Sequence, residues 1–152
     1  MRAGTLNVPG IVGLGYALDL AKKQRISNNK KIKVLRNDLI KQIQTKIPNT
    51  TVNGSTTQRL PNNANISFDK IEGESIMLNL DFKGIEVSTG SACASGSLEP
   101  SYVLTALGLS HFKAHGSIRF TLGKSTTKQD ISKTVDELVK IVKRLRTISP
   151  IK

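Results

Sequence analysis

Cys93 is the only cysteine among the 152 residues, and its surroundings suggest a thiol that is used for chemistry. It lies within residues 88–97, Ser-Thr-Gly-Ser-Ala-Cys-Ala-Ser-Gly-Ser, where small and hydroxylated side chains offer almost nothing apolar to bury it. Most lone intracellular cysteines instead fill a hydrophobic core. The alternative to a reactive thiol is a flexible surface turn that carries an incidental cysteine.

Two elements are expected to hold this cysteine segment. The apolar stretch at residues 85–87 leads into it as a strand, and a helix follows, with Ser97 as the cap, Glu99 and Pro100 in the first turn, residues 102–107 as the body and Gly108 as the stop. A cysteine on a glycine-containing loop between a strand and a helix can be presented to a substrate. A nearby helix N-terminus or cation would favour the thiolate, which is the nucleophilic form.

The sequence around this cysteine resembles a known family. Ser91-Ala92-Cys93-Ala94-Ser95, Ser97-Leu98-Glu99-Pro100-Ser101-Tyr102-Val103-Leu104 and Ala106-Leu107-Gly108 are similar to the catalytic loop and following helix of NifS/IscS-type cysteine desulfurases, which depend on pyridoxal phosphate (PLP). Further matches, in family order, are Arg2-Ala3-Gly4-Thr5, Glu72-Gly73-Glu74-Ser75 and Ala114-His115-Gly116-Ser117-Ile118-Arg119-Phe120-Thr121-Leu122-Gly123. The resemblance therefore covers essentially the whole chain.

The resemblance implies that L-cysteine is converted to L-alanine while its sulfur is transferred to Cys93 as a persulfide. The persulfide would then pass to an iron–sulfur scaffold or another sulfur-acceptor protein. Arg119 matches the arginine that binds the α-carboxylate of the substrate, since a planar guanidinium can donate two parallel hydrogen bonds to a carboxylate. Without the resemblance, an arginine on the polar face of a strand would be interpreted as merely solvated.

Thr5 resembles the residue that contacts the PLP phosphate bound in the other subunit of the family's homodimer. The alternative is a helix cap, because Thr5 immediately precedes a helical pattern. The family's PLP-binding lysine, its ring-stacking histidine and the aspartate that pairs with the pyridine nitrogen have no match in these residues. The resemblance therefore predicts the C-terminal part of a desulfurase, inactive until it is joined to a large domain.

Composition limits the other classes of function. The length suits one domain with a modest core. No apolar run is long enough to span a membrane and no signal-peptide pattern is present, so no membrane association and a cytoplasmic location are expected. One cysteine cannot form an internal disulfide, and with only His111 and His115 beside it no metal site is expected.

The formal net charge of +12 raises the question of a charged partner. Nine basic residues lie between residues 20 and 46 against Asp38 alone, and a second basic group lies between residues 128 and 146. Most of them fall between the apolar positions of predicted helices, as on a solvated face, and few aromatic residues are available to stack on bases. The pattern argues against nucleic acid and favours an acidic protein as the partner.

The hydrophobic spacing predicts the following elements. Helices are expected over residues 8 to about 25 and 32–47, joined by a tight turn at Ser27-Asn28-Asn29, and over residues 74–82 with Gly84 as the stop. Strands are expected at residues 51–53, 64–68 and 117–122, the first two joined by a wide hairpin. A capping-box-like Thr127 and Asp130 begin a long last helix that ends at Ser149.

This order predicts an α+β fold with a small, mostly antiparallel sheet covered by helices. The resemblance implies the small C-terminal domain of the PLP-dependent aspartate-aminotransferase fold, fold type I. Residues 1–26 would form a linking helix from the large domain, and residues 27–152 the small domain, with the catalytic cysteine loop at about residues 88–98. Two alternative functions stay open, a PLP-independent sulfur carrier and a basic protein-binding module that has lost catalysis.

Overall fold

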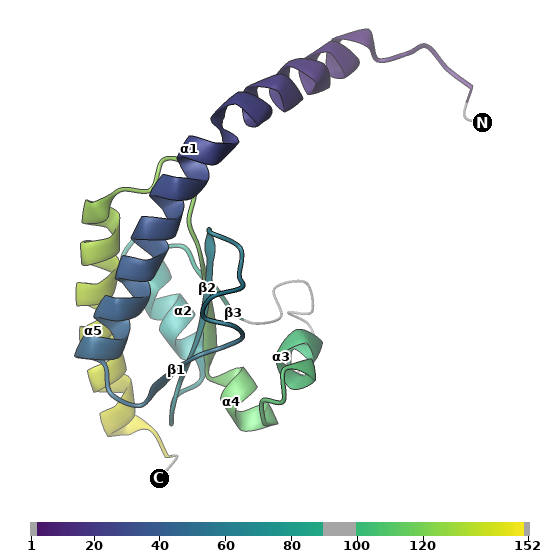
Figure 1. Cartoon of the computed structure of the whole chain (residues 1–152). Coiled ribbons are helices and arrows are strands. Elements are labelled where there is room, and N and C mark those ends of the chain that lie inside the picture. The colour runs from purple at the N-terminus through teal and green to yellow at the C-terminus, as the bar shows by residue number, and fades with distance from the viewer. Residues whose placement is uncertain (1–2, 90–99, 151–152) are drawn as a thin grey trace.

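The computed structural model describes residues 3–89 and 100–150, and it is an α+β fold, as predicted. Figure 1 shows a sheet with long helices on one side and two short helices on the other. The elements are α1 (Val8–Lys46), β1 (Thr50–Val52), β2 (Asn63–Phe68), α2 (Gly73–Asp81), β3 (Ser88–Thr89), α3 (Tyr102–Ala106), α4 (His111–His115), β4 (Ser117–Thr121) and α5 (Lys128–Ile148).

The described strands form one antiparallel sheet in the order β1-β2-β4-β3. The β1–β2 pair is the wide hairpin that the sequence predicts. Alternation along β2 and β4 gives the sheet one apolar face, because Ile66 lies opposite Ile118 and Ala64 opposite Phe120. All four of these side chains are buried.

Helices α1, α2 and α5 cover this apolar face and complete the core. The capping box of α5 is present as predicted: the Thr127 hydroxyl accepts from the backbone N–H of Asp130, and the Asp130 carboxylate accepts from the backbone N–H of Thr127. The Asp130 carboxylate accepts hydrogen bonds from the Thr127 backbone N–H and from the Thr127 hydroxyl, and these two bonds lower its pKa. One face of α5 is apolar and buried in the core, at Ile131, Val135, Leu138 and Val142.

Helix α1 runs through 39 residues without interruption, so the predicted turn at residues 27–29 is wrong. That segment contains no proline or glycine, and asparagine in a helix costs only about 0.7 kcal/mol relative to alanine. The Ser27 hydroxyl donates to the carbonyl of Gln24 within the helix. Its hydrogen bond is therefore made without leaving the helical conformation. The predicted boundary after residue 26 lies inside this helix.

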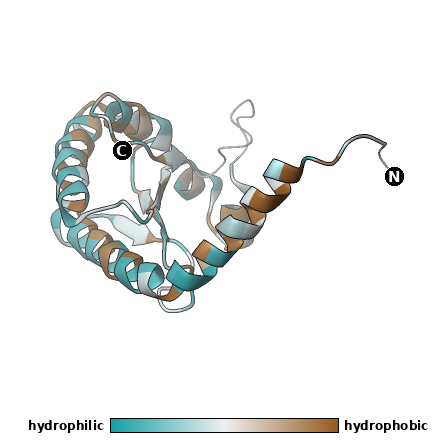
Figure 2. Ribbon diagram, turned by 90° about the horizontal axis from the view of Figure 1, so that it is seen from above, coloured by the Kyte–Doolittle hydropathy of each residue, from teal (hydrophilic) through white to brown (hydrophobic). Residues whose placement is uncertain are grey.

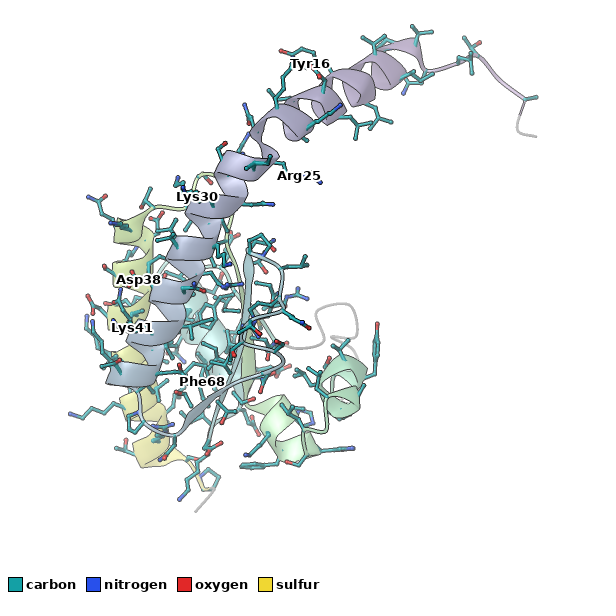
Figure 3. All side chains as sticks on the ribbon, in the orientation of Figure 1. Tyr16, Arg25, Lys30, Asp38, Lys41 and Phe68 are labelled. Atoms are coloured by element: carbon teal, nitrogen blue, oxygen red, sulfur yellow. The ribbon has the colours of Figure 1, made fainter. Side chains whose placement is uncertain are left out.

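The two halves of α1 have different environments. The buried residues of α1, Ile32, Leu35, Arg36, Leu39 and Ile43, all belong to its second half. Every residue from 3 to 27 is exposed, and the first half projects away from the sheet (Figure 1). Figure 2 shows hydrophobic residues in brown along this projecting part, between paler and hydrophilic ones, and in Figure 3 the side chain of Tyr16 extends from it without a neighbouring element.

The helix after the cysteine segment begins later than the sequence predicts. Ser101 precedes its first residue, and Pro100 lies outside the helix rather than in the first turn. Ser97 and Glu99 lie outside the residues that the structure describes. The predicted stop is confirmed, since Gly108 has a φ of +82°, in the left-handed region that glycine adopts readily.

Gly73 allows the start of α2 to lie against the start of β4. A Cβ atom at this position would lie 2.7 Å from the carbonyl oxygen of Ser117 and 2.9 Å from that of His115. Both are backbone atoms, which cannot move away by a side-chain rotation. We therefore expect Gly73→Ala to lower the free energy of unfolding by about 1–3 kcal/mol, measured by urea denaturation.

Gly15→Ala is the matched control for this substitution. Gly15 lies in the exposed half of α1, and a Cβ atom there would meet no heavy atom within 4 Å. The control should unfold at the urea concentration of the parent or above it, because alanine favours a helix more than glycine does. A Gly73→Ala variant with the parent's midpoint would show that the two backbones can separate without cost.

Candidate active site

A row of polar side chains crosses the sheet on the face opposite the core helices. Arg119 on β4 lies directly opposite Asn65 on β2 and, on its other side, opposite Ser88 on β3. Directly opposite residues of antiparallel strands place their side chains on the same face. Arg119 therefore faces away from the apolar side, as the alternation in its strand predicts, and its two neighbours Ile118 and Phe120 are buried in the core.

The guanidinium of Arg119 has no partner in residues 3–89 and 100–150. Its Nε is buried and makes no hydrogen bond. None of the carboxylates in these ranges forms an ion pair with it. A buried donor without an acceptor costs roughly 1–3 kcal/mol, so this arrangement suits a site that an anionic ligand completes.

Cys93 lies in residues 90–99, outside the part of the chain that the structure describes. Its connection to the site is through β3, whose last residue, Thr89, precedes it by four positions. Because β3 pairs with β4 next to Arg119, the fold brings the start of the cysteine segment beside the arginine. The two residues that the sequence singles out for substrate chemistry are thus linked to neighbouring strands.

Thr5 lies outside the sheet, in the segment that precedes α1. It is exposed and precedes the projecting half of α1 (Figure 1). The alternative that it caps the helix is wrong, because Asn7 is the N-cap and its side-chain oxygen accepts from the backbone N–H of Gly10 at 3.1 Å. The Thr5 hydroxyl has no hydrogen-bond partner among the described residues and remains available to a ligand.

The sequence does not predict a hydrogen-bonded network that lies beside Arg119. The side chain of Asn53, just after β1, donates from Nδ2 to Asn65 Oδ1 at 2.6 Å and to Ser67 Oγ at 2.8 Å. Ser67 Oγ in turn donates to the carbonyl of Lys113 in α4 at 3.0 Å. The alternation of β2 predicts that Asn65 and Ser67 share a face, but it does not identify partners so distant in the sequence.

Two further arginines hold the hairpin loop that contains Asn53. Arg59 donates to the backbone carbonyls of Ser55 and Asn53, and Arg36 donates from Nη1 to the carbonyl of Leu60 at 2.7 Å. Burial lowers the pKa of both guanidinium groups, and the charge of Arg36 lowers that of Arg59 further. These contacts keep Asn53 in place against β2.

Comparison with known proteins identifies the family. A family model described as aminotransferase class-V matches residues 1–134. The chain belongs to the class-V aminotransferase family. It is 52% identical over 151 residues to the cysteine desulfurase IscS of Dictyoglomus turgidum (strain DSM 6724 / Z-1310), covering 99% of this chain and 38% of that relative. It is 51% identical over 150 residues to the cysteine desulfurase IscS of Methanosarcina thermophila, covering 99% of this chain and 37% of the relative.

Solved structures confirm the fold of this class-V aminotransferase chain. A NifS-like protein matches it with a TM-score of 0.81 at 29% identity, over 95% of this chain and 36% of that one. The NifS-like protein from Rickettsia africae ESF-5 matches with a TM-score of 0.79 at 30% identity, over 93% and 36% of the two chains. The chain thus spans little more than a third of the length of these proteins.

Thr5 is the one residue of this class-V aminotransferase chain that the resemblance assigns to PLP, and it lies in the described part. A cofactor site needs several polar groups that converge on one cavity. Thr5 is exposed and lies in the segment that precedes α1. In the same residue ranges, no group of three His, Cys, Asp or Glu side chains could hold a metal ion, and no helix is long and apolar enough to cross a membrane.

The basic residues of α1 lie mostly in solvent, as their spacing predicts. Lys30 and Lys41, both labelled in Figure 3, are exposed. Arg36 is the exception, since it is buried beneath the hairpin loop. The ion pairs that the described residues form are Lys23–Asp19, Lys46–Asp136 and Lys140–Glu137, which leave most of this positive charge unpaired.

Proposed function

We propose that this chain is the substrate-carboxylate and sulfur-accepting part of a PLP-dependent cysteine desulfurase. The proposal rests on identity of about half to cysteine desulfurases over nearly the whole chain. The observation that carries the site is the unpaired guanidinium of Arg119. It lies one strand away from the segment that contains the only cysteine.

Arg119 would bind the α-carboxylate of L-cysteine. Its strand is paired on both sides, so the backbone that carries the side chain is fixed. A guanidinium presents several N–H donors in one plane, and a carboxylate can accept two of them in parallel. The ligand would satisfy the donors that the described residues leave unpaired.

Cys93 would accept the sulfur. As a thiolate it attacks the sulfur of bound L-cysteine, forming a sulfur–sulfur bond while the carbon–sulfur bond of the substrate breaks. The electron pair of the broken bond stays with the substrate carbon, which takes a proton and leaves as L-alanine. Cys93 is left as a persulfide, whose outer sulfur can pass to an acceptor such as an iron–sulfur scaffold protein.

PLP would supply the electron sink for the charge that develops on the substrate carbon. Because this chain lacks a lysine in the expected motif, the cofactor would be held by a large domain, with Thr5 reaching the phosphate bound in the second subunit of a homodimer. We place the assembled enzyme in the cytoplasm. In this arrangement residues 1–26 link the large domain to the small domain, residues 27–152.

A chimeric enzyme tests this proposal. In it, this chain replaces the corresponding segment of the Dictyoglomus turgidum relative. We expect the chimera to show a lysine-bound PLP absorption band and to release sulfide and alanine from L-cysteine. The chain alone should do neither, because the lysine and the ring-binding groups are absent from it. The unmodified relative is the positive control.

The outcomes separate the alternatives. Turnover of L-cysteine by the chain alone, or a folded chimera that binds PLP without turnover, would contradict the proposal. If the chain alone took up sulfur on Cys93 from a persulfide donor without PLP, the sulfur-carrier function would be supported instead. Mass spectrometry of the peptide containing Cys93 detects that addition directly.

A further inference from the structure

The hydrogen bonds around Asn65 fix the direction in which its side-chain amide points. The carbonyl oxygen of Lys113 can only accept, so Ser67 Oγ must donate its single hydrogen to it. Ser67 Oγ must then accept from Asn53, which makes the Asn53 group a nitrogen, Nδ2. That nitrogen also contacts Asn65 at 2.6 Å, and the Asn65 atom facing it is therefore the oxygen, Oδ1.

This order leaves the nitrogen of Asn65 with two N–H groups and no acceptor in residues 3–89 and 100–150. The atom is accessible, since the buried side-chain atoms without a partner in these ranges are Arg59 Nη1 and Arg119 Nε. Asn65 lies directly opposite Arg119 on the same face of the sheet. The Cβ atoms of such a pair lie about 4.5–5.5 Å apart, close enough for both side chains to reach one ligand.

We propose that Asn65 is a second substrate-binding residue, whose Nδ2 donates a hydrogen bond to the carboxylate that Arg119 binds. This inference rests on the proposed role of Arg119. The donors come from neighbouring strands, β2 and β4, and neither has an acceptor within the described chain. The network through Asn53, Ser67 and Lys113 keeps the Asn65 oxygen turned away, so that the incoming carboxylate meets N–H groups and no competing acceptor from this side chain.

Asn65→Asp in the chimeric enzyme separates this role from a structural one. Aspartate has the same shape and keeps an oxygen to accept from Asn53, but it replaces the free N–H groups with a negative charge. A hydrogen bond to a charged group contributes about 1.5–3 kcal/mol, so we expect KM for L-cysteine to rise by about tenfold or more, with a smaller change in kcat. Asn65→Ala should raise KM by about tenfold, while Asn53 Nδ2 keeps its bond to Ser67.

Asn63→Asp is the matched control. Asn63 lies on the same strand and the same face, but it is opposite Thr121 instead of Arg119. Its KM should stay within about twofold of the parent, since the added charge lies farther along the strand. Thermal melting of each variant shows that the chimera remains folded.

Arg119→Ala distinguishes a failure of this inference from a failure of the proposed function. If Arg119→Ala raises KM and Asn65→Asp and Asn65→Ala do not, Asn65 is not a ligand and the role of Arg119 stands. If Arg119→Ala itself leaves KM unchanged, the carboxylate is bound elsewhere and both proposals fail. An Asn65→Asp variant that matches the parent, while Asn65→Ala is impaired, would show a purely structural role.

Discussion

Cys93→Ser in the chimeric enzyme is expected to lower sulfide and alanine production from L-cysteine by at least about a thousandfold, because the group that attacks the substrate sulfur is removed. A serine hydroxyl is hardly ionised near neutral pH and is a poor nucleophile towards sulfur. Binding of L-cysteine should persist, since the thiol is needed only after the substrate is bound. The measurements are the rate of alanine release and the spectral change of bound PLP when cysteine is added.

Arg119→Ala is the comparison, because it should weaken substrate binding and leave the sulfur-accepting thiol in place. Losing one charge-assisted partner should weaken binding of L-cysteine by a few kcal/mol, while Cys93 remains able to take up sulfur at saturating substrate. Equal alanine production by the Cys93→Ser variant and the parent would show that another group accepts the sulfur. Mass spectrometry of the persulfide locates that group.

The second large effect concerns the exposed half of α1 in the chain alone. We expect amide hydrogen exchange at residues 8–20 to be at least about a thousandfold faster than at the buried residues of α1 such as Leu39 and Ile43. The exposed half gains no stability from tertiary packing, which supplies most of the stability of helices in proteins. It also contains Gly10, Gly13 and Gly15, each of which costs about 1 kcal/mol in a helix interior.

Self-association is the other expected outcome at high concentration, and it must be separated from packing within one chain. The exposed half carries apolar side chains in contact with water, among them Val12, 65% exposed, and Leu14, 63% exposed. Exposed apolar patches of this kind promote association. Protection of residues 8–20 that rises with protein concentration would indicate association through this surface. Strong protection in a strictly monomeric sample would mean that the helix packs on its own domain, contrary to the structure. In the chimera the same residues should be protected at any concentration.

The sequence predicts most of the fold because the deciding signals are local. The capping box at Thr127 and Asp130, the glycine stop at Gly108 and the alternation of β2 and β4 each depend on residues a few positions apart. The break predicted at residues 27–29 is wrong because those residues are polar but include no glycine or proline, and polar residues alone do not stop a helix. Which half of α1 packs on the sheet depends on contacts that its own spacing does not reveal.

In the candidate site, too, the features set by local spacing are predicted and those set by distant contacts are not. Alternation along β4 predicts the face of Arg119, and the structure confirms it. The free amide of Asn65 follows only from a chain of hydrogen bonds through Asn53, Ser67 and Lys113, which come from distant parts of the sequence. Residue type indicates that an asparagine can donate or accept, and only its partners decide which end faces the ligand.

Because α1 is continuous, a rotation of the sheet is coupled to a displacement of the far end of the helix. Its second half is fixed in the core beneath β2 and β4, and its first half extends into solvent without a glycine or proline at the junction. The stretch from Val8 to Ile32 spans about 36 Å at the usual rise of a helix, so each degree of rotation of the sheet displaces the far end by about 0.6 Å. A domain that packs against the exposed half would therefore determine the orientation of the sheet and of Arg119.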